Sequence, residues 1–318
     1  MNWYMVIALI ATFAITMALA PVVIPWLRRL KFGNTEREEG VKSHLKKAGT
    51  PSMGGMMFLV AMLPVSLLMA GKYPNIIPVL ILTIGFGIVG FLDDYLKVVK
   101  KNSDGLLPWQ KLFLQFVITC IFVFWMMKFT DVTMEMLIPF TGGMTIDIGI
   151  FAIPFLFIVV LATVNGVNFT DGVDGLASSV TVVVAFFFVF ASLAKGAGLE
   201  PLAFAVIGGL LGFLWHNAHP AKIFMGDTGS LALGGFVAGT AYMLNMPLFI
   251  PIIGIIYTVE LLSVVMQVSY FKMTHGKRIF KMTPIHHHFE LSDWSETKVV
   301  TVFTIVTILF CTVGYMAM

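Results

Sequence analysis

The chain has 318 residues, of which 58% are apolar and 12% are charged, and its net charge of +3 is small. Soluble domains carry about 25% charged residues, so this composition excludes an ordinary soluble globular protein and indicates an integral membrane protein. The two cysteines, Cys120 and Cys311, lie in separate apolar runs, which excludes a disulfide framework and a zinc site built from cysteines.

Apolar runs long enough to cross a bilayer recur along the whole chain. Backbone groups in lipid must pair within their own segment, so we expect helices; the strands of a membrane barrel would alternate in polarity instead. The predicted fold is an all-α polytopic membrane protein with about ten transmembrane helices, forming one domain over residues 1–318. The expected spans are residues 3–27, 52–70, 75–92, 112–128, 150–164, 176–194, 201–215, 230–246, 249–270 and 298–317.

The first span is expected to be uncleaved, because no basic leader precedes it and Pro21 directly follows the Ala-Leu-Ala sequence, residues 18–20, that mimics a cleavage site. Most of the 20 Lys and Arg residues fall in alternate loops, which are therefore predicted to be cytoplasmic, with both chain termini outside. An outer hairpin is expected in residues 131–148. The expected cytoplasmic loops, which would form the active site, are about 28–51, 93–111, 165–175, 216–229 and 271–297.

Two short motifs match known patterns by chance. The run GFGIVG, residues 85–90, fits the dinucleotide-binding pattern, but it lies inside an apolar span without the strand and helix that this pattern requires. We expect its glycines to allow close helix packing instead. The sequence Asn168-Phe169-Thr170 fits a glycosylation sequon but falls in a loop expected in the cytoplasm, so no glycan is expected there.

Asp93 and Asp94 end the third span. The helix dipole makes an acid at this end unfavourable by about 0.3–1 kcal/mol, and two adjacent carboxylates favour a shared cation or a shared proton. The nearby Lys97, Lys100 and Lys101 would offset this charge or bind anionic lipid headgroups. The alternative is that the acids merely begin a solvated loop.

The run NGVNFTDGVDGLAS, residues 165–178, carries two asparagines and two aspartates among glycines. We expect Thr170 or Asp171 to cap the next helix, and the spacing of Asp171 and Asp174 to place both on one helical face. A helix start favours phosphate, but carboxylates in the same place suit a phosphate only if a divalent cation bridges them. A simple capped turn would explain one of these acids and not both.

The run GDTGS, residues 226–230, opens the eighth span and adds Asp227 as a third acidic site on the same side. The alternative for Asp227 is a simple N-cap. Phe224 is an aromatic ring in a polar loop, which either stacks on a base or anchors the loop at the membrane surface.

Three consecutive histidines, residues 286–288, follow four cations in the last cytoplasmic loop. On a helix they would point about 100° apart, so at most two serve one site, and the zinc-protease pattern H-E-x-x-H is absent. Glu260 lies inside the ninth span, with Gln267 two turns later. An ionisable group there is functional by default, and helix–helix bonding is the alternative.

Acids, histidines, lysines and anion-binding helix starts are thus all expected at the cytoplasmic membrane surface. Acids alone would repel a phosphate, and lysines alone would hold it without chemistry. Together they favour magnesium-dependent phosphoryl transfer, in which the metal rests on one or two carboxylates and on substrate phosphates. The position at the bilayer surface indicates that one reactant is a lipid.

Five motifs stand in order between about residues 46 and 290: GTPSMGG, FLDDYLK, NGVNFTDGVDGLA, FMGDTGSLALGG and TPIHHHFEL. With them the chain resembles the bacterial phospho-N-acetylmuramoyl-pentapeptide transferase family, of the polyprenyl-phosphate N-acetylhexosamine-1-phosphate transferase superfamily. The resemblance implies a Mg2+ enzyme of the cell membrane that transfers phospho-N-acetylmuramoyl-pentapeptide from its UDP derivative to undecaprenyl phosphate. The products would be UMP and the first lipid intermediate of peptidoglycan synthesis, which cell wall biogenesis, cell shape and cell division require.

The resemblance also implies roles for individual residues. Asp227 matches the family's magnesium ligand, and Asp93 is the favoured base on the lipid phosphate, with a covalent aspartyl-phosphate route left open. Phe224 matches the aromatic residue beside the uracil. The implied catalytic residues are Asp93, Asp94, Asp174 and His286. The implied substrate-binding residues are Lys47, Asn168, Asp171, Asn217, Phe224, Gln267 and His287.

Three other functions stay open from the sequence. The first is a sister enzyme that transfers N-acetylglucosamine-1-phosphate from its UDP derivative to undecaprenyl phosphate. The second is a transporter, which would place its acids at mid-bilayer. The third is a purely structural membrane protein, which would explain none of the five motifs. No nucleic-acid partner is expected, and a homodimer is an open alternative.

Overall fold

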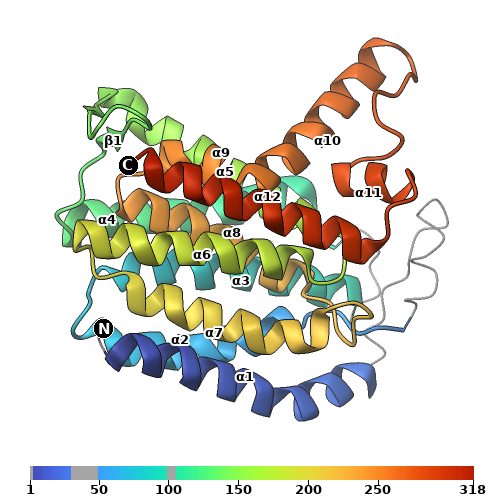
Figure 1. Ribbon diagram of the computed structural model, residues 1–318, viewed down its shortest axis with the longest axis horizontal. Coiled ribbons are helices and arrows are strands. Elements are labelled where there is room, and N and C mark those ends of the chain that lie inside the picture. Colours follow the sequence, from blue (N-terminus) through green and yellow to red (C-terminus); the bar gives the residue numbers. More distant parts are fainter. Residues whose placement is uncertain (1–2, 30–48, 99–104) are drawn as a thin grey trace.

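The computed structural model describes residues 3–29, 49–98 and 105–318. It is a bundle of long helices whose axes run in nearly the same direction, with α10 (Ile255–Met273) leaning away at the upper right of Figure 1. The other long helices are α1 (Trp3–Arg29), α2 (Gly55–Ala70), α3 (Ile76–Val98), α4 (Pro108–Phe129), α5 (Ala152–Thr170), α6 (Leu176–Lys195), α7 (Glu200–Asn217), α8 (Gly226–Met243) and α12 (Glu296–Met316). The short elements are β1 (Met136–Leu137), β2 (Thr145–Ile146), the 3-10 turns η2 (Gly149–Phe151) and η3 (Pro247–Phe249), α9 (Ile250–Ile253) and α11 (Ile285–Glu290).

Seven helical segments in the described residues are long and apolar enough to cross a membrane, namely α1, α3, α4, α5 with η2, α6, α10 and α12. Large apolar side chains such as Leu68, Phe113 and Ile158 are exposed on the outside of the bundle, where lipid would surround them. The prediction of an all-α polytopic membrane protein is therefore confirmed. The number of crossings and the side on which the termini lie stay predictions.

The ninth expected span, 249–270, is two helices rather than one. α9 ends at Ile253 and α10 begins at Ile255, with Gly254 between them. A Cβ at Gly254 would lie 2.8 Å from the ring of Tyr257 and 2.9 Å from the carbonyl oxygen of Ile250. The close turn at this position therefore requires glycine, and it lets α10 leave the bundle at an angle (Figure 1).

α5 is longer than the expected fifth span, because the polar run that we expected in a loop continues the helix to Thr170. The Thr170 hydroxyl donates to the carbonyl oxygen of Gly166 at 2.8 Å, so it is satisfied within its own helix. The predicted cap of the next helix by Thr170 or Asp171 is therefore wrong. α6 begins after Gly175, whose φ is +78°, and Asp171 and Asp174 lie in the intervening turn, not on a shared helical face.

The expected hairpin is present between α4 and α5. β1 and β2 pair antiparallel, with Met136 opposite Ile146 and Leu137 opposite Thr145. Gly142 and Gly143 lie between the strands with positive φ, a conformation that glycine adopts without strain. These glycines explain why the chain can reverse direction here.

α8 occupies the centre of the bundle (Figure 1), and every residue of it from Thr228 to Met243 is buried. Its most extensive contact is with α3. A Cβ at Gly90 of α3 would lie 2.0 Å from the carbonyl oxygen of Asp227, and one at Gly87 would lie 3.4 Å from Ala232. Close packing through the glycines of the GFGIVG run is therefore confirmed, and it places the end of α3 against the start of α8.

We expect Gly90→Ala to destabilise the protein, because the added methyl group cannot fit unless the backbone of α3 or α8 moves. Overpacking of this kind costs about 1–3 kcal/mol, measurable as a lower melting temperature of the detergent-solubilised protein. Gly71→Ala is the matched control, since Gly71 has a helical φ of −60° and no atom lies within 4 Å of its added Cβ. An unchanged melting temperature for Gly90→Ala would show that the two helices are not this closely packed.

Candidate active site

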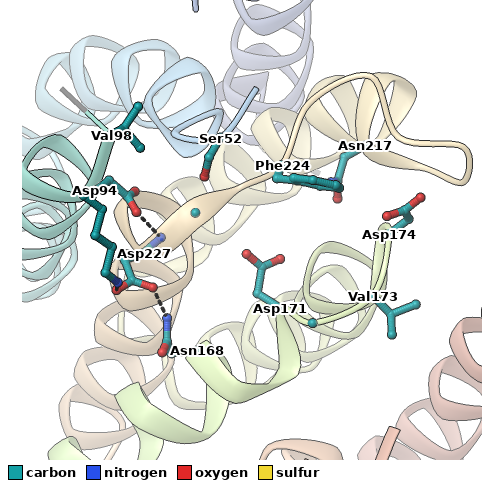
Figure 2. Close-up of a pocket in the computed structure, with 13 residues that line it drawn as sticks. Ser52, Asp94, Val98, Asn168, Asp171, Val173, Asp174, Asn217, Phe224 and Asp227 are labelled. Carbon is teal, nitrogen blue, oxygen red and sulfur yellow. Dashed lines mark hydrogen bonds and ion pairs between the residues drawn. The ribbon is translucent and has the colours of Figure 1, made fainter. Parts of the chain in front are cut away.

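A polar cavity of about 280 Å³ lies at one end of the bundle, where α3 and α5 end and α8 begins. Figure 2 shows side chains from these three helices, and from the turns that join them to their neighbours, pointing toward a common space. The cavity is lined by Ser52, Asp94, Lys97, Val98, Asn168, Asp171, Gly172, Val173, Asp174, Asn217, Phe224, Gly226 and Asp227.

The lining contains most of the site residues that the sequence singled out. Asp94, Asn168, Asp171, Asp174, Asn217, Phe224 and Asp227 belong to it. The structure places Asp93, His286, His287 and Gln267 outside the lining. Lys47 lies outside the described residues.

Asp227 is the second residue of α8, where the partial positive charge of a helix start favours a carboxylate. Its Oδ1 accepts a hydrogen bond from the Asn168 amide at 2.8 Å. Its Oδ2 accepts from Lys111 at 2.9 Å and from Lys97 at 3.3 Å. Three different helices therefore hold this carboxylate, which Figure 2 shows at the edge of the cavity.

Asp94 holds the beginning of α8, although it belongs to α3. Its Oδ2 accepts from the backbone N–H of Thr228 at 2.9 Å and from the Thr228 hydroxyl at 2.6 Å, and its Oδ1 accepts from the N–H of Asp227 at 3.2 Å. The N-cap residue of α8, Met225, makes no side-chain cap bond. Asp94 thus satisfies N–H groups that a helix start leaves unpaired, in the way that a capping side chain normally does.

Asp93 is bound by a different set of donors. Its Oδ2 lies 2.7 Å from Lys97 Nζ and 3.6 Å from Lys111 Nζ, and its Oδ1 accepts from the N–H of Leu106 at 2.7 Å. Lys97 and Lys111 are therefore shared between Asp93 and Asp227. The spacing of Lys97 four residues after Asp93 predicts this ion pair, whereas no sequence pattern singles out Lys111 on α4.

The turn after α5 brings Asp171 to the cavity, where Figure 2 shows its carboxyl group pointing into the open space. Burial raises the pKa of Asp171 well above its ordinary value, and the negative charges of Asp227 and Asp94 raise it further. Among the residues that line the cavity, four aspartates lie beside the single lysine Lys97, and acids that outnumber the cations in this way favour a bound cation.

Asp174 faces the loop that follows α7. Its Oδ2 accepts from the N–H of Ala221 at 3.0 Å and lies 3.0 Å from His219 Nδ1. Asp174, His219 and Glu296 offer ligand atoms within 4.8 Å of one another, but the contacts with His219 and Ala221 already tie Asp174 to the loop after α7. We read Asp174 as a residue that holds the cavity wall in place.

The GTPSMGG motif, residues 49–55, supports the loop that carries Phe224. The N–H of Phe224 donates to the carbonyl oxygen of Pro51 at 2.8 Å, and the N–H of Gly54 donates to that of Phe224 at 2.8 Å. Asn217 stabilises the same loop through its amide, which donates to the carbonyl oxygen of Ile223 at 3.0 Å. These bonds explain how Phe224 is held beside the cavity in Figure 2.

The three histidines point to different partners, as their helical spacing predicted. His286 Nδ1 lies 3.1 Å from Glu260 Oε1, and His287 Nδ1 lies 2.8 Å from Glu290 Oε2. His288 Nδ1 accepts from the N–H of Lys281 at 3.1 Å. The Gln267 amide binds the backbone of residues 279 and 280, with distances of 2.9 to 3.1 Å.

The residues around Asp227 fit a magnesium ion. Asp227, Asp171 and Asn168 offer oxygen atoms, which are the ligands that Mg2+ prefers, and the crowded negative charge at Asp171 is of the kind that a divalent cation relieves. Gly226, with a φ of +73°, leaves the space between Asp94 and Ser52 free of a side chain, since a Cβ there would lie 2.6 Å from Asp94 Oδ2 and 2.8 Å from Ser52 Oγ.

Comparison with known proteins identifies the family of the chain. The model of glycosyl transferase family 4 matches residues 76–245. Phospho-N-acetylmuramoyl-pentapeptide-transferases of Acetivibrio thermocellus and Clostridium botulinum are 48% and 49% identical to the chain over 316 residues, which cover 98% of this chain and 95% of each relative. The enzyme of that name from Clostridium perfringens is 47% identical over 98% of this chain and 97% of its own length. The chain therefore belongs to glycosyl transferase family 4 and, within it, to the phospho-N-acetylmuramoyl-pentapeptide transferase family.

Proposed function

We propose that the protein transfers phospho-N-acetylmuramoyl-pentapeptide from its UDP derivative to undecaprenyl phosphate, giving lipid I and UMP. The observation that carries the proposal is the convergence of Asp94, Asp171, Asp227 and Lys97 on one cavity at the end of a membrane helix bundle. The names of relatives at 47–49% identity support the choice of substrates. The cation-rich loops favour a location of the cavity on the cytoplasmic side of the cell membrane.

The residues that would hold Mg2+ are Asp227 and, beside it, Asp171. When bound, the ion supplies the positive charge that stabilises the leaving UMP. Asn168 orients Asp227 through its hydrogen bond to Oδ1. Lys97 and Lys111 bind Asp227 Oδ2 and are placed to turn toward the phosphates of the incoming nucleotide, since their side chains are 40% and 21% exposed.

In the transfer, an oxygen of the lipid phosphate bonds to the phosphorus next to the sugar, and the bond from this phosphorus to UMP breaks. Asp93 acts as the base that takes the proton of the lipid phosphate. One of its oxygens is held by the N–H of Leu106, and the other faces Lys97 and Lys111. The proton therefore reaches Asp93 Oδ2 once Lys97 turns to the substrate phosphates.

We assign Asp94 a positioning role rather than proton transfer. It is 5% exposed, and its three hydrogen bonds all go to Asp227 and Thr228. A proton on the Asp94 carboxyl group would remove an acceptor from the N–H groups at the start of α8. Asp94 thus acts through Asp227, whose backbone it holds in place.

The sister reaction with UDP-N-acetylglucosamine is not favoured, because the relatives bear the name of the pentapeptide transferase. A transporter is not favoured either, since the aspartates of the cavity gather at one end of the helices in the described chain. Purified protein given each UDP-sugar with undecaprenyl phosphate separates the two enzymes, and release of UMP without flux across vesicles separates an enzyme from a transporter.

Removal of Mg2+ with EDTA should stop UMP release, and excess Mg2+ should restore it. Asp227→Asn should lower turnover by about 10²-fold or more, because it removes one negative charge from the proposed metal site. Asp147→Asn is the control. Asp147 follows the second strand of the hairpin, and within the described residues its side chain accepts a hydrogen bond from the N–H of Gly149, at the end of α5 far from the cavity. Full turnover of Asp227→Asn, or of wild type in EDTA, would contradict the assigned roles.

Asp93→Asn and Asp94→Asn should fail in different ways. Asn at position 93 still accepts from Leu106 but cannot take a proton, so kcat should fall about 10²- to 10⁴-fold at every Mg2+ concentration. Asn at position 94 turns an NH2 group toward the donors of α8, so the Mg2+ concentration for half-maximal rate should rise about 10- to 100-fold. The assay is UMP release across a Mg2+ titration; a rate of Asp94→Asn that saturating Mg2+ does not raise would rule out its positioning role.

A further inference from the structure

Glu260 and His286 form a buried pair that lies outside the lining of the cavity. Glu260 is on α10 and His286 is the second residue of α11. His286 Nδ1 lies 3.1 Å from Glu260 Oε1, and both side chains are 0% exposed. A glutamate buried in this way in an apolar helix is costly unless its partner stabilises it, so the pair has a reason beyond packing.

The other nitrogen of the His286 ring faces the active-site turn. A Cβ at Gly172 would lie 2.2 Å from His286 Nε2, and Gly172 lines the cavity between Asp171 and Asp174. Position 172 therefore needs glycine so that the ring can approach the turn. Within the described residues, His286 Nε2 is buried and has no hydrogen-bond partner. A buried polar atom without a partner costs about 1–3 kcal/mol, so this nitrogen calls for a partner that arrives from outside the chain.

Glu260 decides what kind of partner this can be. An ionised glutamate only accepts hydrogen bonds, so with Glu260 ionised Nδ1 carries the ring proton. In the neutral ring Nε2 is then an acceptor, and it requires an O–H or N–H group. The lipid phosphate carries one hydroxyl, whose proton the proposed transfer gives to Asp93, whereas the nucleotide sugar has several hydroxyl and amide groups. The chemistry of the ring therefore selects the nucleotide sugar.

We propose that Glu260 is a positioning residue that fixes the tautomer and the orientation of His286, so that His286 Nε2 accepts a hydrogen bond from an O–H or N–H group of the nucleotide-sugar donor beside Gly172. The identity of this donor rests on the proposed function; the effect of Glu260 on the ring does not. A carboxylate that orients a histidine through its second nitrogen is a common arrangement in metal and catalytic sites.

The kinetic test uses Glu260→Gln, which keeps the size of the side chain. A glutamine both donates and accepts, so it no longer dictates which ring nitrogen carries the proton. We expect the KM for UDP-N-acetylmuramoyl-pentapeptide to rise about tenfold, the worth of one hydrogen bond, while the KM for undecaprenyl phosphate stays unchanged. In a His286→Ala background, Glu260→Gln should add no further effect.

Glu200→Gln is the matched control, since Glu200 is also buried and accepts a hydrogen bond from Ser192 at 2.5 Å. Glu200 begins α7, whereas the cavity residue Asn217 ends it, so Glu200 lies at the end of the helix far from the cavity. This variant should leave both KM values unchanged. Two results would overturn the proposal. One is an equal rise of both KM values in Glu260→Gln, and the other is a tenfold rise of the KM for UDP-N-acetylmuramoyl-pentapeptide when Glu260→Gln is added to His286→Ala.

The second test does not depend on transfer activity. Nitrogen NMR of histidine-labelled protein should show His286 with its proton on Nδ1 in wild type, and a mixture of the two tautomers in Glu260→Gln. A proton on Nε2 in wild type would overturn the role of Glu260 whatever the substrate. If the NMR result holds but UDP-N-acetylmuramoyl-pentapeptide is not turned over, the proposed function fails and the positioning role of Glu260 stands.

Discussion

The hydrogen bonds from the start of α8 to the Asp94 carboxylate are the interaction on which the rest of the site depends. At the end of α3 the helix dipole opposes this charge, but the start of α8 favours it by a similar amount, about 0.3–1 kcal/mol for each end. The effects of the two helix dipoles on Asp94 therefore nearly cancel, and the three hydrogen bonds determine where its carboxylate lies. Gly90 makes the contact feasible, because any side chain there would meet the backbone of Asp227.

The charge balance of the cavity follows from this contact. Once α3 is fixed against α8, Asp93 and Asp227 lie close enough to share Lys97 and Lys111. Asp94 and Asp171 then add two more carboxyl groups to the same cavity. Burial raises the pKa of Asp171, and the nearby charges of Asp227 and Asp94 raise it further. A cavity with this surplus suits a divalent ion and, with it, a substrate that carries phosphates. The same arrangement repels a phosphate that arrives without a cation.

The sequence predicted the helices well because lipid allows few alternatives: a long apolar run must satisfy its backbone as a helix. Its errors lie at the ends of helices. Thr170 stays inside α5 because its hydroxyl binds the Gly166 carbonyl oxygen, and hydropathy does not register such a bond. The ninth span is divided at Gly254, where the ring of Tyr257 and the carbonyl oxygen of Ile250 occupy the space of a Cβ, and hydropathy registers only a continuous apolar run there.

The sequence by itself determined the class of protein, the order of its helices and the residue types of the site, because these follow from apolar run length and from motifs that are contiguous in the chain. Only the tertiary structure decided which partner each of these residues binds and therefore which role it has. Asp93 and Asp94 are neighbours in sequence, yet one binds lysines and the other caps a helix 133 residues further on. Lys111 reaches Asp227, and Glu260 reaches His286, from other helices. Such roles depend on which backbones approach one another in space, and that is set by packing between segments far apart in the chain.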